Sequence, residues 1–312
     1  MRALVIDLGG THATLAVVED NNIIGSEELA LDRAHGLGSV LPLFVSTFST
    51  LLARLGVTRE SCDGLALSFC GLADSRTGRV VSTNQKYDDA TSLDLPAWCR
   101  REFNLPFKIE NDARMALLGE QFAGAAKGFD DVVMITLGTG IGGAAMMNGQ
   151  LVRGKHVQGG CLGGHLPVLF DGRQCTCGAI GCTEAEASGW ALPLIAKEWP
   201  GFAESKLAKE SEVNFRAVFT LATNGDAVAK GIRDRCIRVW AAGAVGLVHA
   251  YDPEVIVIGG GVMRSADVII PVIQEHVIKH SWTPWGNVQV KSAELGNHAG
   301  LLGAVPLLSR RN

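Results

Sequence analysis

Three times in this chain, an apolar run typical of a buried strand leads directly into a glycine-rich turn. The turns cover residues 7–11 (DLGGT), 137–143 (LGTGIGG) and 259–261 (GGG). Glycine has no Cβ, so the backbone N–H groups of such turns can crowd around an anion. A single turn of this kind is explained by the general preference of glycine for tight turns. Three of them after strands, with the hydroxyls of Thr11 and Thr139, predict that the chain binds a nucleotide.

The first two turns belong to a repeated pattern. Apolar runs at 3–9 and 13–19 flank the first turn, and runs at 132–137 and 142–147 flank the second about 129 residues later. A third strand near 22–29 completes the first copy, and Asn148-Gly149, which favours a type I′ hairpin turn, follows the second. The repeat predicts a duplicated α/β fold with one copy in each of two lobes, which suits a length of 312 residues.

Helical patterns fill the intervals between these strands. The expected helices cover residues 39–55, 112–124, 184–197, 213–223 and 225–249, and further strands are expected at 64–70 and 78–81. The tail at 299–308 is also expected to be helical and to pack back on the first lobe.

Charge and hydropathy exclude several classes of protein. The net charge is -4 and no cluster of four or more Lys or Arg occurs, which argues against a nucleic-acid partner. Asp7 interrupts the first apolar run, unlike a signal peptide, and we expect no membrane-spanning segment or membrane partner. The sequence thus predicts a cytoplasmic protein.

The glycines of the second turn also match the dinucleotide-binding pattern G-x-G-x-x-G at Gly138, Gly140 and Gly143. That motif needs a helix opening at its third glycine, whereas residues 144–149 have the pattern of a strand and a hairpin turn. An NAD-dependent dehydrogenase therefore stays only as an alternative, which a lack of cofactor reduction with any sugar would exclude. The Walker sequence and the protein-kinase motifs are absent from the sequence.

One short segment contains a histidine and three of the eight cysteines, with the spacing H-x9-C-x-C-x4-C. These residues are His165, Cys175, Cys177 and Cys182. One imidazole and three thiols match a closed tetrahedral zinc site, which leaves no position for water and is therefore structural. A histidine that binds metal through one ring nitrogen can direct the other towards a substrate hydroxyl. The alternative is three reduced core cysteines beside an unrelated histidine.

The motifs, in their order along the chain, resemble those of the ROK sugar kinases of the actin-like ATPase superfamily, and the chain is glucokinase-like. The motifs are the three glycine turns, residues 109–112 (IEND), the cysteine segment and residues 299–304 (AGLLGA). The resemblance implies a two-lobed, ribonuclease H-like α/β fold with an interlobe cleft. The small lobe would cover 1–113, with a C-terminal helix at 298–312 packed on it, and the large lobe with the zinc loop would cover 114–297. A homo-oligomer, dimer or tetramer, is also implied.

The resemblance further implies ATP-dependent phosphorylation of a hexose or hexose derivative, with Mg²⁺. Asp112 would be the catalytic base, and Asp7 would orient the metal. The phosphates would bind at Gly9, Gly10, Thr11, Gly138, Thr139, Gly140, Gly260 and Gly261. The sugar would contact Gly71, Asn84, Asn111, Asp112, His165 and Glu184. From the residues alone, Asp112 is also explained as a helix cap, and Glu184 as a solvated carboxylate at a helix start.

The chain departs from the family pattern at one position. The usual segment Ala-Gly-Glu-x-Gly-His reads GCLGGH at 160–165, so Leu162 stands where a glutamate accepts hydrogen bonds from the sugar. A sugar-sensing protein or degenerate kinase without activity is therefore kept as an alternative, although Asn111, Asp112 and the phosphate turns favour an enzyme. A sugar-responsive repressor is rejected because the first nucleotide-binding strand begins at residue 3, where a helix-turn-helix would be needed.

Overall fold

The computed structural model describes residues 1–32, 36–83 and 86–310. The chain forms two compact units. Unit 1 comprises residues 1–128, 153–159 and 294–312, and unit 2 comprises residues 129–152 and 160–293. Each unit is built on one five-stranded sheet.

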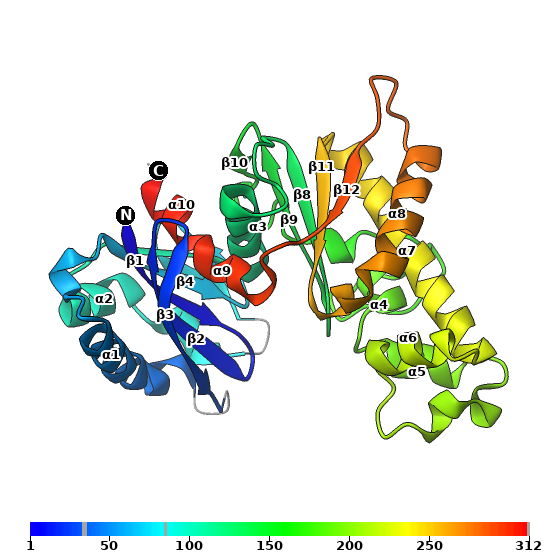
Figure 1. Ribbon diagram of the computed structural model, residues 1–312, viewed down its shortest axis with the longest axis horizontal. Helices are drawn as coiled ribbons and strands as arrows, with labels where there is room; N and C mark the ends of the chain where they lie inside the picture. The colour runs from blue at the N-terminus through cyan, green and yellow to red at the C-terminus, as the bar shows by residue number, and fades with distance from the viewer. Residues whose placement is uncertain (33–35, 84–85, 311–312) are drawn as a thin grey trace. The chain divides into compact units, whose positions relative to one another are not determined.

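The sheet of unit 1 has the strand order β3-β2-β1-β4-β7. Its strands are β1 (Arg2–Leu8), β2 (His12–Glu19), β3 (Asn22–Ala30), β4 (Gly64–Phe69) and β7 (Phe107–Asn111). β1, β4 and β7 run parallel, whereas β2 and β3 are antiparallel additions (Figure 1). The carboxyl ends of three parallel strands therefore meet at one sheet edge, where ligands bind in open α/β sheets.

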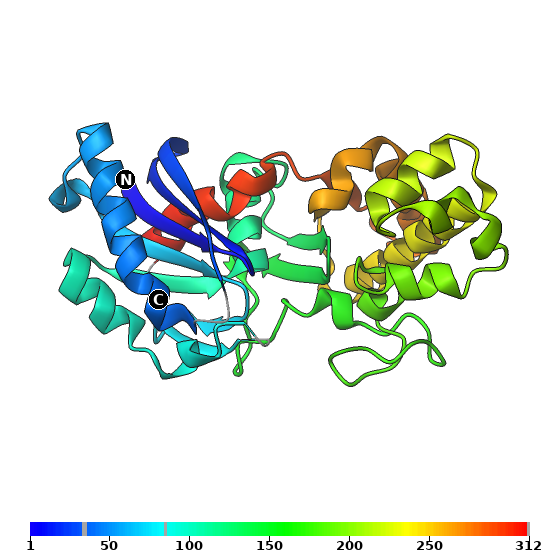
Figure 2. The ribbon, with the colours of Figure 1, turned by 90° about the horizontal axis from the view of Figure 1, so that it is seen from below.

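Helices α1 (Gly36–Leu55) and α2 (Leu95–Phe103) pack on one face of this sheet. Phe48 of α1 and Trp98 of α2 both meet the ring of Phe103 edge-on, at centroid distances of 5.7 and 5.5 Å. α10 (Ala304–Ser309) contacts β1 and β4, and α3 (Asp112–Ala123) packs against α9 (Ala299–Leu302) and α10 (Figure 2). A hairpin of β5 (Leu72–Asp74) and β6 (Arg79–Ser82) and the short helices η2 (Arg59–Ser61), η3 (Asp88–Ser92) and η8 (Gly296–His298) complete unit 1.

The boundary between the units differs from the one expected at residue 113, because α3 belongs to unit 1. A Cβ on Gly119 of α3 would lie 2.0 Å from the Ala299 carbonyl oxygen, and one on Gly303 would lie 2.1 Å from the Met115 carbonyl oxygen. Glycine at both positions lets the backbones of α3 and the C-terminal helices touch. The C-terminal segment of unit 1 begins at residue 294 rather than 298, and the N–H groups of Glu294 and Leu295 donate to the Glu120 carboxylate of α3.

Unit 2 repeats the topology with the strand order β10-β9-β8-β11-β12. Its strands are β8 (Val132–Leu137), β9 (Ile141–Met147), β10 (Gln150–Leu151), β11 (Val255–Gly259) and β12 (Gln289–Ser292). The predicted duplicated α/β fold is confirmed. Asn148 and Gly149 connect β9 to β10 with φ angles of 51° and 68°, so a hairpin stands where a dinucleotide-binding domain would have a helix.

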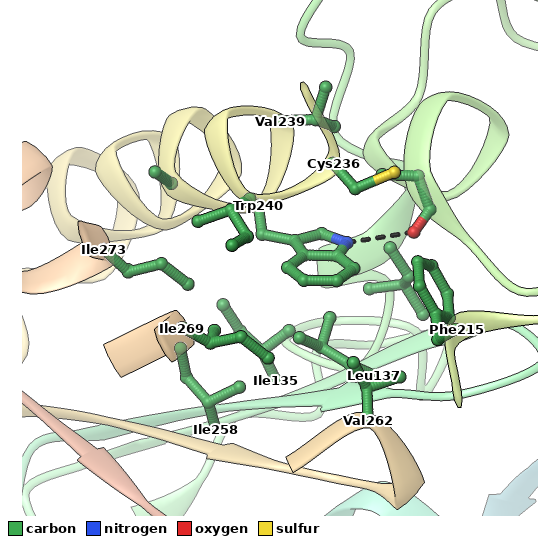
Figure 3. Close-up of a cluster of buried hydrophobic side chains, with 14 of the residues drawn as sticks. Ile135, Leu137, Phe215, Cys236, Val239, Trp240, Ile258, Val262, Ile269 and Ile273 are labelled. Carbon is green, nitrogen blue, oxygen red and sulfur yellow. Dashed lines mark hydrogen bonds between the residues drawn. The ribbon is translucent and has the colours of Figure 1, made fainter. Parts of the chain in front are cut away.

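Helices α4 (Thr183–Ala187), α5 (Leu192–Lys197), α6 (Phe215–Thr223), α7 (Ala227–Tyr251) and α8 (Ala266–His280) belong to unit 2, with the short helices η4 (Gly163–His165), η5 (Phe202–Glu204), η6 (Lys206–Lys209) and η7 (Gly261–Ser265). Trp240 of α7 lies in the core between α6, α8 and the sheet (Figure 3). Its ring packs among Leu137, Phe215 and Ile269, while its Nε1–H donates to the Ala187 carbonyl oxygen at 2.9 Å. The buried indole is thus both packed and hydrogen-bonded.

Two expected helices are each divided in the structure. The segment 184–197 forms α4 and α5, because the N–H groups of Gly189 and Trp190 donate to the carbonyl oxygens of Gly138 and Thr139 instead of continuing a helix. The tail forms α9 and α10, which meet at Gly303.

Within the described part of the chain, α1 is long and apolar enough to cross a membrane by length and composition, with a mean hydropathy of 1.6. This result does not contradict the expectation of no membrane-spanning segment, because the core helix of a folded protein passes the same test. Buried side chains of α1, such as Phe44, Phe48 and Leu51, belong to the core of unit 1. Core helices commonly pass the same test, so this criterion alone carries little weight.

We expect Gly119→Ala to lower the free energy of unfolding by about 1–3 kcal/mol, because the added methyl group forces α3 away from α9. Gly246→Ala is the matched control, since the nearest heavy atom to its new Cβ, Leu166 Cδ1, is 4.0 Å away. Alanine is favoured over glycine in helices, so this control should gain up to ~1 kcal/mol. Urea unfolding followed by circular dichroism measures both; equal stabilities would contradict the close approach.

Candidate functional site

The predicted site residues of unit 1 gather at the carboxyl ends of its parallel strands. Asp7, Gly9, Gly10 and Thr11 end or follow β1, Gly71 follows β4, and Asn111 and Asp112 lie where β7 meets α3. Asn84 lies outside the described residues.

Hydrogen bonds to two backbone carbonyl groups, those of Gly9 and His12, stabilise the turn after β1. The Gly9 N–H donates to the His12 carbonyl oxygen at 2.9 Å, and the hydroxyl of the buried Tyr87 donates to the Gly9 carbonyl oxygen at 3.1 Å. Among the described residues, none accepts a hydrogen bond from the N–H groups of Gly10 and Thr11. These two donors are therefore free for an anion.

Asp7 is a partly buried carboxylate at the end of β1. Burial raises the pKa of Asp7 to about 6, and the nearby negative charge of Asp112 also raises it. Gly300 of α9 leaves room for the Asp7 side chain, because a Cβ there would lie 3.0 Å from Asp7 Oδ2. A divalent cation near Asp7 and Asp112 would offset the repulsion between their negative charges.

Asn111 is the residue that caps α3. Its Oδ1 accepts from the Arg114 N–H at 3.3 Å, while its Nδ2 donates to the Gly71 carbonyl oxygen at 3.1 Å and to Asp112 Oδ1 at 2.9 Å. Asn111 is therefore the N-cap residue of α3, and Asp112 is the first residue of the helix. Gly71 is required at its position, since a Cβ would lie 2.4 Å from the Ser82 carbonyl oxygen.

Asp112 is anchored through one carboxylate oxygen only. Its Oδ1 accepts from Asn111 Nδ2 and from the Ala113 N–H, whereas no described residue donates to Oδ2. The side chain reaches solvent, yet the protein around it desolvates the carboxyl group and raises its pKa, against the Ala113 N–H and the Lys86 charge. Oδ2 is thus oriented by the anchored Oδ1 and has no hydrogen-bond donor among the described residues.

A buried network of ion pairs holds the end of β7, the strand that leads into Asn111 and Asp112. The carboxylate of Glu110 lies 3.3 Å from Arg114 Nη1 and 2.8 Å from Arg153, and neither Glu110 nor Arg114 has side-chain exposure. Arg114 also donates to the Gly159 carbonyl oxygen. These bonds tie residues 153–159 to unit 1.

Lys86 is a residue that the sequence analysis missed. Its Cε and Nζ lie 3.4 and 3.6 Å from the place that a Cβ on Gly10 would occupy. Its positive charge also lowers the pKa of Asp112 and of Cys70 against the effect of burial. No motif singled it out, because a lone lysine in a loop carries no spacing signal.

In unit 2, the other two glycine turns are neighbours. β8 and β11 pair in parallel with Gly259 opposite Thr136, so the turns that follow them end at the same sheet edge. Gly260 has a φ angle of 95°, and a Cβ on it would lie 2.2 Å from the Leu137 carbonyl oxygen. A cavity of about 580 Å³ opens beside Gly261, with Phe215, Arg216, Arg264 and Ser265 among its lining residues.

Glu184 connects the second glycine turn to the cysteine segment. Its Oε2 accepts from the Ile141 N–H at 2.8 Å, and its Oε1 accepts from Trp190 Nε1 at 3.2 Å and from the Thr176 hydroxyl at 3.5 Å. The carboxylate lies in the first turn of α4 and is partly exposed, but protein donors also hold both of its oxygens.

The predicted metal ligands lie together in unit 2. The ligand atoms of His165, Cys175, Cys177 and Cys182 are all within 4.8 Å of one another. His165 Nδ1 is 3.5 Å from Cys175 Sγ, and the sulfurs of Cys177 and Cys182 are 3.7 Å apart. Sulfurs about 2.3 Å from a tetrahedral zinc ion are separated by about 3.8 Å, so the cluster has the dimensions for a metal ion. An unrelated histidine is excluded.

The pKa values of two thiols in this cluster are shifted in opposite directions. Burial raises the pKa of Cys177, but hydrogen bonds from the Ala179 N–H and the neighbouring thiols outweigh it, and the net shift is downward. Burial and the same neighbours raise the pKa of Cys182 to about 12. The hydrogen bonds to Cys177 shift it towards the thiolate, the form of cysteine that binds metal.

Two units of the same topology, with glycine turns at the carboxyl ends of their parallel strands, define an actin-like ATPase fold. The chain matches the ROK family over residues 3–311 and belongs to this family.

Relatives of known structure and name agree with this assignment. Glucokinase from Thermotoga maritima is 30% identical over 322 aligned residues that cover 100% of this chain and 98% of the relative. The crystal structure of a ROK hexokinase from Thermus thermophilus has a TM-score of 0.82 at 30% identity and covers 98% of this chain and 97% of that one. A ROK family glucokinase from Streptomyces griseus, solved with glucose and AMPPNP, has a TM-score of 0.76 at 29% identity, with coverages of 98% and 99%.

Proposed function

We propose that this protein is an ATP-dependent sugar kinase of the hexokinase or glucokinase type, acting on a hexose or hexose derivative. The observation that carries the proposal is Asp112, whose Oδ1 is fixed by two donors and whose Oδ2 is left without one among the described residues. It lies in the same unit as the open N–H donors of Gly10 and Thr11. The relatives named glucokinase, and the neighbour solved with glucose and AMPPNP, support it.

In the proposed reaction, Asp112 Oδ2 accepts the proton of a sugar hydroxyl. The hydroxyl oxygen forms a bond to the γ-phosphorus of ATP while the bond from that phosphorus to the β–γ bridging oxygen breaks, and ADP leaves with the electron pair. Such transfers depend mainly on positioning and charge stabilisation. Asp7 is the residue that would orient Mg²⁺, which neutralises phosphate charge when bound.

The remaining predicted residues would bind the two substrates. Unit 1 would supply phosphate donors at Gly9, Gly10 and Thr11 and sugar contacts at Gly71, Asn84 and Asn111. Unit 2 would supply phosphate donors at Gly138, Thr139, Gly140, Gly260 and Gly261, and sugar contacts at His165 and Glu184. The cavity beside Gly261 has the size and mixed lining that an adenosine group needs.

A sugar panel with ATP and Mg²⁺, read by ADP formation, tests the proposal. Sugar binding without ADP formation would favour the alternative of a sensor or degenerate kinase, and reduction of NAD would favour a dehydrogenase. The homo-oligomeric state and the cytoplasmic location stay predictions.

The cysteine cluster is proposed to hold a structural zinc ion. The ligands would be His165, Cys175, Cys177 and Cys182, and His165 would bind through Nδ1, the nitrogen beside Cys175. The Nε2 atom would then remain free for a hydroxyl of the sugar.

We expect about one zinc per chain in protein purified without chelator, because the described part of the chain contains one Cys₃His set. Cys177→Ser should weaken zinc retention and sugar binding by loosening the loop that carries His165. Cys62→Ala, a cysteine of unit 1 outside the cluster, is the control and should keep its zinc. Elemental analysis decides; an absence of zinc from the wild type would refute the proposed site.

A further inference from the structure

Lys86 lies beside the proposed phosphate-binding turn of unit 1, and its charge also acts on Asp112, the proposed base. Its ammonium nitrogen is 3.6 Å from the Cβ position of Gly10, and its alkyl chain is 3.4 Å from the same point. The same charge acts on the carboxylate of Asp112 and on the thiol of Cys70. Both distances from Gly10 are ordinary van der Waals distances, so the lysine side chain lies directly beside the turn.

The backbone beside Lys86 is fixed to that turn. Tyr87 is buried, with only 1% of its surface exposed, and its hydroxyl bonds to the Gly9 carbonyl oxygen. Tyr87 also has a φ of 57°, a left-handed conformation that costs a bulky residue free energy. The Lys86 N–H donates to the Thr83 carbonyl oxygen at 3.1 Å. The position of the lysine beside the turn is therefore supported by its neighbour Tyr87, which is bonded to Gly9 and has a strained backbone conformation.

The ammonium group of Lys86 has no ion-pair or hydrogen-bond partner among the described residues. Across the described ranges, no carboxylate lies within ion-pair distance of Lys86 Nζ, and no carbonyl oxygen accepts from it. A lysine ammonium is a compact charge with three donors, well suited to phosphate oxygens.

We propose that Lys86 binds the γ-phosphoryl group of ATP and stabilises the charge that develops on it during transfer. The inference rests on the proposed kinase function. The sugar hydroxyl loses its proton to Asp112 as its oxygen bonds to the γ-phosphorus, so that phosphorus must lie close to Asp112. The ADP oxygen departs from the same phosphorus. A cation that contacts the Gly10 turn and acts on Asp112 is close to both the phosphate-binding turn and the base. It is therefore well placed to stabilise the charge that accumulates on the phosphoryl group in the transition state.

The test compares Lys86→Met and Lys86→Arg with Lys127→Met, an exposed lysine of the same unit. Methionine keeps the apolar chain that packs on Gly10 and removes only the charge. We expect Lys86→Met to lower kcat by about 10²–10³-fold, as removal of one preorganised donor does. Lys86→Arg should recover part of that loss, and Lys127→Met should behave as wild type.

Nucleotide affinity separates this role from a structural one. Calorimetry should show AMPPNP binding weakened about tenfold or more in Lys86→Met, because a charged contact to the γ-phosphate is lost. ADP, which lacks that phosphate, should bind with unchanged affinity, and thermal unfolding should not shift.

Several results would overturn the proposal. Wild-type turnover in Lys86→Met, or equal weakening of ADP and AMPPNP, would remove Lys86 from the γ-phosphate. A rise in the sugar KM alone would place the ammonium on the sugar instead. If wild type forms no ADP with any sugar, the kinase function fails, whereas the contrast between AMPPNP and ADP still tests the phosphate contact.

Discussion

Asp112→Asn should leave the fold and the sugar affinity intact while turnover falls by about 10²-fold or more, as expected when a positioned base is removed. The asparagine oxygen can still accept from Asn111 Nδ2 and the Ala113 N–H at the place of Oδ1. The amide nitrogen that replaces Oδ2 cannot accept a proton. The substitution therefore removes the base and preserves the anchor.

Calorimetry of sugar binding and a coupled ADP assay on the same preparation decide this prediction. Asp171→Asn, an exposed aspartate of unit 2, controls for the loss of one negative charge. Turnover near that of wild type in Asp112→Asn would show that Asp112 serves only the start of α3.

The pH dependence of kcat/KM follows from the same carboxylates. Asp112 acts when deprotonated, so activity is lost as pH falls through its pKa, which desolvation raises above the ordinary value of 3.8. Asp7, with a pKa of about 6, protonates on the same acid side. In Asp112→Asn the residual activity should still fall on that side, because burial still raises the Asp7 pKa, but with a midpoint at slightly lower pH, because the smaller contribution of the Asp112 charge is gone. An unchanged midpoint would contradict the coupling of the two groups.

The repeated topology could be predicted from the sequence because its markers are local. Each glycine turn directly follows its strand, and the order β3-β2-β1 and the order β10-β9-β8 are hairpin connections set by nearby turns. The metal ligands were predictable for the same reason, since all four lie between residues 165 and 182.

Other parts of the site depend on contacts between distant residues. The approach of Gly119 to Ala299, which assigns α3 to unit 1, joins positions far apart in the chain and leaves no periodic signal. Glu184 was predicted as a site residue, but its bonds to Ile141 and Trp190 follow from the fold and not from spacing. The position of Lys86 likewise depends on the bond from its neighbour Tyr87 to Gly9, which joins residues far apart in the sequence.

Leu162→Glu should improve glucose as a substrate selectively, by about tenfold or more in kcat/KM. Glutamate stands here in the ROK segment that reads GCLGGH in this chain, and hydrogen bonds to a charged group contribute about 1.5–3 kcal/mol each. Leucine cannot accept one. Leu162 immediately precedes η4, its carbonyl oxygen accepts from the His165 N–H at 2.9 Å, and its side chain is 41% exposed. A glutamate is therefore accommodated without burying a charge.

For the wild type, the same argument makes plain glucose a poor substrate, because the preferred sugar presents an apolar or differently oriented group near Leu162. A deoxy position, an altered epimer or an acyl methyl group meets that requirement. Measurements of kcat/KM with glucose, mannose, fructose, allose and N-acetylated hexosamines compare wild type with Leu162→Glu and Leu162→Gln. Leu169→Glu, at an equally exposed leucine of the same unit, is the control for added charge. If wild type already prefers glucose and Leu162→Glu brings no selective gain, a bridging water or another side chain supplies the acceptor, and position 162 does not set the specificity.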